Sequence, residues 1–186
     1  MDNGFIPNHG NYHKLKSYQK SLIIYQGTQF FCKKFLSKFD RTVDQMIQAA
    51  RSGKQNIIEG CMASATSKET EIKLVNIARA SLEELLEDYY DHIRSKAGLV
   101  WDKNSKKALF VRNLAYSPNE TYTTYKAYIE SRESHVVANI IICLIHQCNF
   151  LLNRQISALE KDFLKHGGIR ERMSKADRKS TRLNSS

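Results

Sequence analysis

The sequence predicts an all-α protein: an antiparallel up-down four-helix bundle with an irregular insertion, 99–132, between the third and fourth helices. Three observations lead to this fold class. Only two prolines interrupt the 186 residues, and 41% of the residues are hydrophobic, which favours long helices around one core. Four stretches repeat apolar residues at spacings of three and four, the period of one helix face. The length suits one domain rather than two.

The first two helices are expected to follow a short lead-in. Residues 1–17 are polar and are interpreted as flexible, and the bundle is expected to occupy 18–166, its first helix beginning near Lys14. That helix is expected to end at about Lys38. Asp40 is a suitable N-cap because its carboxylate can accept from a free amide at a helix start. A second helix is therefore predicted over 41–61, although its end at Gly60 is ambiguous.

The third and fourth helices have clear start or stop signals. Thr66-Ser-Lys-Glu69 matches a capping box, in which the first hydroxyl and the last carboxylate satisfy free amides. It predicts a third helix from 66 to about 96, ended by Gly98. The fourth helix, 133–165, is the most apolar of the four, and Gly167 and Gly168 are expected to stop it.

The 99–132 insertion is harder to interpret. A short helix is predicted over 106–114, and Ser117-Pro-Asn119 predicts a turn. The segment also contains four tyrosines that are expected either to pack over the end of the bundle or to form a stacking platform for bases. They are Tyr116, Tyr122, Tyr125 and Tyr128.

Positive charge is distributed unevenly along the chain. The formal net charge is +10, and chains this basic often bind polyanions. Residues 1–60 and 92–132 each have an excess of five Lys and Arg, whereas 69–91 has an excess of five Asp and Glu. An acidic helix is thus expected between two basic segments. The same pattern also fits charge complementarity within one soluble protein.

Cysteine use and hydropathy predict a cytoplasmic protein. The four cysteines form no Cys-x-x-Cys pair, and residues 1–5 lack the basic and apolar regions of a signal peptide. Reduced thiols are therefore expected. The most apolar run, 136–152, is interrupted by Asn and His, which favours a buried helix over a membrane span.

No catalytic or metal-binding pattern stands out. A di-iron bundle needs Glu-x-x-His on two helices, and no Glu lies three residues before His92, His135, His146 or His166. Cys143 and His146 share a helix face but lack a second ligand pair. Gly-x-Ser-x-Gly and phosphate-binding glycine loops are also missing. We therefore expect no catalytic residue, no metal, no cofactor and no enzymatic activity.

One face of the second helix is polar but contains no Lys or Arg. It comprises Gln45, Gln48, Ser52, Asn56 and Glu59, followed by Gly60. Amide and hydroxyl groups of this kind suit a hydrated contact between helices or subunits. A solvated face of neutral residues is the alternative.

The candidate nucleic-acid-binding residues are basic side chains near the first two helices. Positive charge is sufficient for phosphate contacts, which need little sequence-specific geometry. A solvated basic surface would have the same composition. The candidates are Lys14, Lys16, Lys20, Lys33, Lys34, Arg51 and Lys54.

Two groups of motifs resemble a known family. Gln55-Asn-Ile-Ile-Glu-Gly60, Ser67-Lys-Glu69 and Ile77-Ala-Arg-Ala-Ser-Leu-Glu-Glu84 resemble a bacterial four-helix-bundle family, first noted as proteins encoded in intervening sequences of large-subunit ribosomal RNA genes. They are also similar to the accessory variability determinant of diversity-generating retroelements. The stretch 144–155, with Gly167-Gly-Ile-Arg-Glu-Arg-Met173, resembles a longer subgroup with a four-helix-bundle suffix.

The resemblance implies an up-down bundle that assembles as a ring-shaped homopentamer. For the retroelement members it also implies a basic surface that binds nucleic acid and a partner reverse transcriptase. Asn56, Glu59 and Gly60 match the family motif and are interpreted as structural or interface residues. The 99–132 insertion and the acidic third helix depart from the family, which leaves the reverse-transcriptase partner doubtful.

These observations predict a non-enzymatic, oligomeric helical protein that binds RNA or DNA through basic surface. A scaffold that docks an acidic protein partner, without nucleic acid or membrane, is the alternative. Residues 167–176 are expected to form a basic suffix. Residues 177–186 resemble the conceptual translation of a sequencing adapter, and without them the formal charge would be +8 rather than +10.

Overall fold

The computed structural model describes residues 10–167, and within that range the protein is all-helical, without strands. This confirms the predicted all-α class. The elements are η1 (Tyr12–Lys14), α1 (Lys16–Phe35), α2 (Arg41–Ala63), α3 (Lys68–Ser95), α4 (Lys106–Leu114), α5 (Tyr122–Ser131) and α6 (Ser134–His166). The expected features of residues 1–9, of most of the suffix 167–176 and of 177–186 lie outside the described residues.

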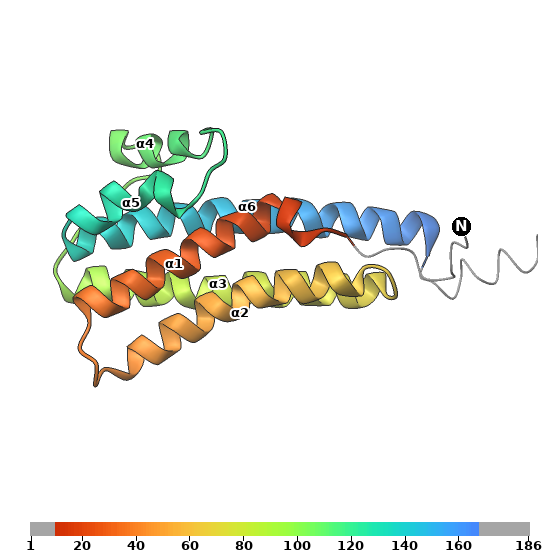
Figure 1. The fold of residues 1–186 in the computed structure, drawn as a ribbon, viewed down its shortest axis with the longest axis horizontal. Coiled ribbons are helices and arrows are strands. Elements are labelled where there is room, and N and C mark those ends of the chain that lie inside the picture. The colour runs from red at the N-terminus through yellow and green to blue at the C-terminus, as the bar shows by residue number, and fades with distance from the viewer. Residues whose placement is uncertain (1–9, 168–186) are drawn as a thin grey trace, which may run out of the picture.

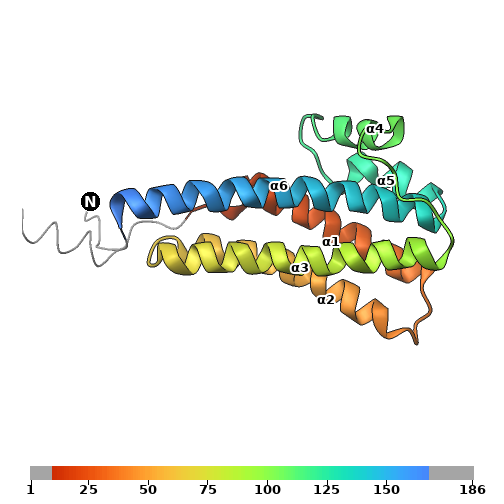
Figure 2. The same ribbon diagram turned by 180° about the vertical axis from the view of Figure 1, so that it is seen from behind.

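Four long helices run along one another, with two short helices on one side of them. α2 packs on α3, α3 on α6, and α1 on both α2 and α6. Figure 1 shows α4 and α5 lying beside α6, near the end that holds the α1–α2 connection. The α2–α3 connection lies at the opposite end, as the reverse view in Figure 2 confirms. The segment 99–132 therefore adds a second layer over one end of α6.

The core forms where the apolar stripes of the long helices meet. α6 contributes the largest share, and its buried positions recur at helical spacing through Val137, Ile141, Leu144, Ile145, Cys148 and Leu152. Fully burying one such aliphatic side chain contributes roughly 1.5–3 kcal/mol. Because α6 contacts α1, α3, α4 and α5, both layers of the fold are assembled on this single apolar helix.

α2 and α3 pack closely together at two glycines of α2. A Cβ added to Gly53 would lie 2.8 Å from Leu82 Cδ2, and a Cβ added to Gly60 would lie 3.4 Å from Glu71 O. Leu82 is fully buried and has little room to move. Gly60 is an interior contact residue, since α2 continues past it to Ala63.

The helix starts agree with the sequence at α2 and differ by one residue at α3. Asp40 Oδ1 accepts from Thr42 N at 2.9 Å, which confirms the predicted N-cap. The predicted capping box at Thr66 is wrong: Ser67 is the N-cap, and its hydroxyl accepts from Thr70 N at 3.1 Å. Thr66 Oγ1 instead donates to Ala63 O at 3.2 Å. α2 extends farther than predicted, to Ala63, so the N-cap of α3 lies one residue later in the chain.

The end of α3 depends on two adjacent residues. Ala97 has a φ of 50°, so the left-handed residue that closes the helix is not the predicted Gly98. Gly98 N donates to Ile93 O at 2.9 Å. A Cβ on Gly98 would lie 3.3 Å from His135 Cβ, so this glycine allows the chain to pass close to α6.

The 99–132 segment contains more regular structure than expected. The short helix predicted over 106–114 is confirmed as α4. α5, however, was not predicted, and describing the whole segment as irregular is wrong. Thr and Tyr have modest helix propensity, and α5 is stabilised instead by tertiary burial of Tyr125 and Ile129. Of the four tyrosines, Tyr125 is fully buried, whereas Tyr116 is exposed.

We expect Gly53→Ala to destabilise the protein, because the new methyl group would overlap the buried Leu82 side chain. Overpacking of this kind costs about 1–3 kcal/mol, and the better helix propensity of Ala offsets up to about 1 kcal/mol. Urea unfolding followed by circular dichroism measures the change.

The matched control is Gly27→Ala in α1. Its added Cβ would lie 3.5 Å from Ile141 Cδ1, an ordinary contact distance. This variant is expected to be as stable as the parent or more stable. A Gly53→Ala midpoint equal to that of Gly27→Ala would contradict the close approach of α2 and α3.

Candidate nucleic-acid interface

The polar stripe predicted on α2 divides into an internal contact and an exposed part. Ser52 Oγ lies 3.0 Å from Ser81 Oγ of α3, and Asn56 Nδ2 donates to Ser52 O at 2.9 Å. Ser52 and the buried Gly60 therefore contact α3 within one chain, whereas the Asn56 amide is bonded inside α2. The remaining members, Gln45, Gln48 and Glu59, are exposed.

The predicted basic residues do not form one patch. Lys14 ends η1 and Lys16 begins α1, whereas Lys33 and Lys34 lie at the end of α1. At 1.5 Å per residue, the two pairs are about 25 Å apart. Arg51 and Lys54 lie on α2, where the Lys54 ammonium is placed 5.1 Å from the centre of the Tyr25 ring. Separate small clusters result.

Lys20 is buried and has no role on the surface. Its ammonium forms an ion pair with Glu120 and donates to Gln147 Oε1 at 2.9 Å. The Tyr125 hydroxyl donates to the same Glu120 oxygen. Burial lowers the pKa of Lys20, while the hydrogen bond and charge of Glu120 act in the opposite direction. Lys20 therefore leaves the candidate set, and its function is to hold the segment before α5 against α1.

A concave site lies between α4, α5 and α6, with a volume of about 470 Å³. Its apolar lining consists of Val111 of α4 and of Val136 and Ile140 of α6. Aromatic and basic side chains form the rest of the lining: Trp101, Lys106, Lys107, Phe110, Tyr128 and Arg132. We call it the cationic pocket.

The electrostatics of the cationic pocket favour an anion. Three cations line it, and in the part of the chain that the structure describes no carboxylate does. Among the described residues, none of Lys106, Lys107 and Arg132 forms an ion pair. Lys106 and Lys107 are also the first two residues of α4, where the helix dipole adds positive potential.

The aromatic rings of the cationic pocket are close to one another and to a cation. The Phe110 and Tyr128 rings meet edge to face, with centroids 5.2 Å apart. Lys107 Nζ lies 5.7 Å from the centre of the Trp101 ring. The site therefore combines positive charge with exposed aromatic surface, since 47% of Phe110 remains accessible.

Two hydrogen-bonded anchors position the walls of the pocket. Asn139 of α6 is fully buried; its Oδ1 accepts from Trp101 N at 2.7 Å, and its Nδ2 donates to Leu99 O at 3.0 Å. The Lys20–Glu120 pair fixes the chain that leads into α5. Both walls are thereby tied to the long helices.

Most of the pocket was not predicted from the sequence. Of the residues that line the pocket, only Tyr128 was a candidate from the sequence, as part of a stacking platform for bases. The available signal was the excess positive charge of 92–132. That charge excess did not identify Trp101, Phe110 or Arg132 as lining residues. Helix α5, which was not predicted, brings Tyr128 and Arg132 toward α4.

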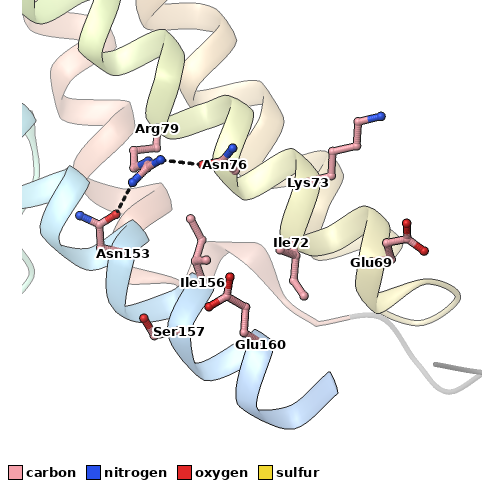
Figure 3. A pocket seen from close by; sticks show the side chains of 9 residues that line it. All are labelled: Glu69, Ile72, Lys73, Asn76, Arg79, Asn153, Ile156, Ser157 and Glu160. Carbon is pink, nitrogen blue, oxygen red and sulfur yellow. Dashed lines mark hydrogen bonds between the residues drawn. The ribbon is translucent and has the colours of Figure 1, made fainter. Parts of the chain in front are cut away.

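A second groove, of about 720 Å³, lies between the beginning of α3 and the end of α6. Figure 3 shows Arg79 held between two amides, donating to Asn153 Oδ1 at 3.0 Å and to Asn76 Oδ1 at 2.8 Å. Glu69 and Glu160 also line the groove. Its mixed charge suits a polyanion less well than the cationic pocket does.

Cys143 and His146, the weak metal-ligand pair, belong to separate environments. Burial raises the pKa of the Cys143 thiol to about 11. His146 is exposed, and its Nε2 lies 3.0 Å from the Tyr90 hydroxyl. Within residues 10–167, no three His, Cys, Asp or Glu side chains are grouped as metal ligands.

By length and composition, Ser134–Lys165 of α6 is apolar enough to cross a membrane, and 61% of its most apolar stretch is buried by the rest of the fold. The core helix of a soluble protein meets the same criteria, so length and composition do not place it in a membrane.

His92 of α3 is a buried titratable group outside both concave sites. Its ring lies edge to face with Phe31 at a centroid distance of 4.8 Å, and its Nε2 has no hydrogen-bond partner among the described residues. Burial lowers its pKa from the ordinary 6.5, and the positive charges of Lys96 and His135 lower it further. The folded chain therefore favours the neutral imidazole.

Comparison of the chain with protein-family models, with curated proteins and with solved structures finds no match.

We expect the buried Lys20–Glu120 pair to show strong coupling. Lys20→Met alone leaves a carboxylate without its cation, and breaking a buried pair costs about 3–5 kcal/mol. The double variant Lys20→Met/Glu120→Leu is expected to lose much less than the sum of the single variants. A double-mutant cycle in urea measures the coupling. The control is Arg94→Met, which removes the exposed ion pairs with Asp91 and Glu87 and is expected to cost less than about 1 kcal/mol.

We expect stability to fall as the pH decreases below about 6.5, because the unfolded chain then binds a proton on His92 that the folded chain resists. The loss should continue until the pH passes the lowered folded-state pKa. Replacing His92 with Gln is expected to reduce the slope of unfolding free energy against pH in this range. A His92→Gln slope equal to that of the parent protein would contradict the assignment.

Proposed function

We propose that this protein is a non-enzymatic nucleic-acid-binding protein. The observation that supports this best is the cationic pocket, in which three cations without carboxylate partners among residues 10–167 surround exposed aromatic surface. Phosphate groups bind Lys and Arg through charge, largely without regard to base sequence. The separate clusters at the two ends of α1 extend the positive surface toward a longer polyanion.

A polyanion accounts for the spacing of these charges better than a small acid would. Lys33 and Lys34 lie at the end of α1, and Lys34 Nζ donates to Glu130 O of α5 at 2.7 Å. This contact places the basic end of α1 beside the layer that contains the cationic pocket. A nucleic-acid backbone could neutralise both groups of cations at once, whereas a single carboxylate could not.

The proposal includes the architecture and the assembly. We propose an antiparallel up-down four-helix bundle made of α1, α2, α3 and α6, related to the family of the ribosomal RNA intervening sequences, in a cytoplasmic homo-oligomer. The alternating positions of the connections support the topology. The exposed neutral surface of Gln45 and Gln48 on α2 is a candidate subunit contact. By resemblance the oligomer is a pentamer, and light scattering on the purified protein would measure its mass.

Protein docking is the second candidate function. The groove between α3 and α6 supports it, because two amides hold Arg79 in one orientation. A guanidinium fixed in this way is well suited to a carboxylate of an acidic partner. Capture of a protein without nucleic acid, lost on Arg79→Gln, would favour this candidate over nucleic-acid binding.

We expect the full chain to bind mixed RNA and DNA oligonucleotides at low salt, with an affinity that falls as salt rises. Replacing Lys106, Lys107 and Arg132 together with Gln is expected to weaken binding and to reduce the slope of log K against log salt by up to about 3, if each cation neutralises one phosphate. Fluorescence anisotropy at several salt concentrations measures both quantities.

A charge-matched control separates a local site from general attraction. Replacing Lys73, Lys161 and Lys165 with Gln removes the same number of cations from exposed positions on α3 and α6. This control should change the slope less than the pocket variant does. No binding at the lowest salt would refute the proposed function, and equal losses in the two triple variants would remove the pocket from it.

A further inference from the structure

The aromatic side chains of the cationic pocket are not explained by phosphate binding alone. Phosphate contacts need cations or amide donors and gain little from rings. Here three rings, those of Trp101, Phe110 and Tyr128, line the same concave surface as the cations. The ligand should therefore have an apolar planar part beside its negative charge.

A nucleobase attached to its phosphate meets this requirement. Bases stack on aromatic side chains largely independently of their identity, because every base has a π face. The volume of about 470 Å³ lies within the range of about 300–1,000 Å³ that small-molecule sites occupy. In a duplex the faces of the bases are covered by their neighbours, so a base can enter the pocket only when it is unpaired and unstacked.

We propose that the cationic pocket binds an unpaired base of a single-stranded nucleic acid, with the adjacent phosphates on Lys106, Lys107 and Arg132. This inference rests on the proposed function and adds to it a preference for single strands over duplex. The cations come from two elements, the beginning of α4 and the end of α5, so the backbone on each side of the base meets positive charge. Val136 and Ile140 of α6 add apolar surface to the same site.

The exposed ring of Phe39 lacks this combination. Phe39 is 97% exposed in the α1–α2 connection, outside both concave sites. It offers aromatic surface without the surrounding walls, and therefore serves as a control position for the aromatic contribution.

The pocket contains its own spectroscopic probe. Trp101 is the only tryptophan in the sequence, so tryptophan fluorescence of the full chain reports this site alone. We expect a single-stranded oligonucleotide to quench Trp101 emission by stacking, with the same midpoint as the anisotropy change. A duplex of the same sequence and inorganic polyphosphate should bind through charge with much less quenching.

Two variants separate stacking from charge. Phe110→Leu keeps an apolar side chain but removes a ring, and is expected to weaken single-strand binding about 5- to 100-fold while leaving the salt slope unchanged. Phe39→Leu should leave binding unchanged. Thermal melting checks that both variants remain folded, and Tyr128→Leu gives an independent test if Phe110→Leu does not fold.

The outcomes distinguish this inference from the proposed function. Salt-dependent binding with equal affinity for single strands and duplex, unaffected by Phe110→Leu and Tyr128→Leu, would overturn the inference and leave nucleic-acid binding intact. Quenching by polyphosphate as strong as that by the oligonucleotide would also overturn it. A mononucleotide that binds as tightly as the oligonucleotide would assign the pocket to free nucleotides. Absence of all binding would refute both proposals.

Discussion

The close contact between α2 and α3 is the constraint on which the arrangement of the long helices depends. Gly53 leaves no space for a side chain against Leu82, and Gly60 faces the backbone at Glu71. Ser52 and Ser81 form a polar contact beside the same interface. Small residues on α2 therefore set the separation of the two helices. That separation in turn determines how α3 presents its apolar residues to α6.

The second layer depends on a different kind of interaction. α4 and α5 contribute only a few buried residues, such as Ala108, Val111, Tyr125 and Ile129. Polar anchors supplement this small apolar contact: the ion pair of Lys20 with Glu120 and the Tyr125 hydroxyl on the same carboxylate. A buried ion pair adds little net stability compared with apolar packing. Its geometry, however, specifies where the layer sits, and the cationic pocket exists only because the layer is held there.

Local patterns were sufficient to predict the long helices, since their apolar residues recur at helical spacing and Asp40 has a local partner in Thr42. They were less informative where distant residues decide the outcome. Ser67 replaced Thr66 as the cap because α2 continued to Ala63. α5 was missed because its stability comes from burying Tyr125 and Ile129. The site was harder still: Lys20 looked like any surface lysine, and its partner Glu120 lies 100 residues away in sequence.

Asn139 has a consequence for the dynamics of the linker that follows α3. Its buried amide group holds the backbone on both sides of Val100, through Leu99 O and Trp101 N. Leu99 and Val100 are exposed, and such a segment would ordinarily open as an independent surface loop. Here the Trp101 amide cannot exchange its hydrogen without release from Asn139 of α6, the helix that contributes the largest share of the core. We therefore expect this linker to open together with α6, and not independently as a surface loop.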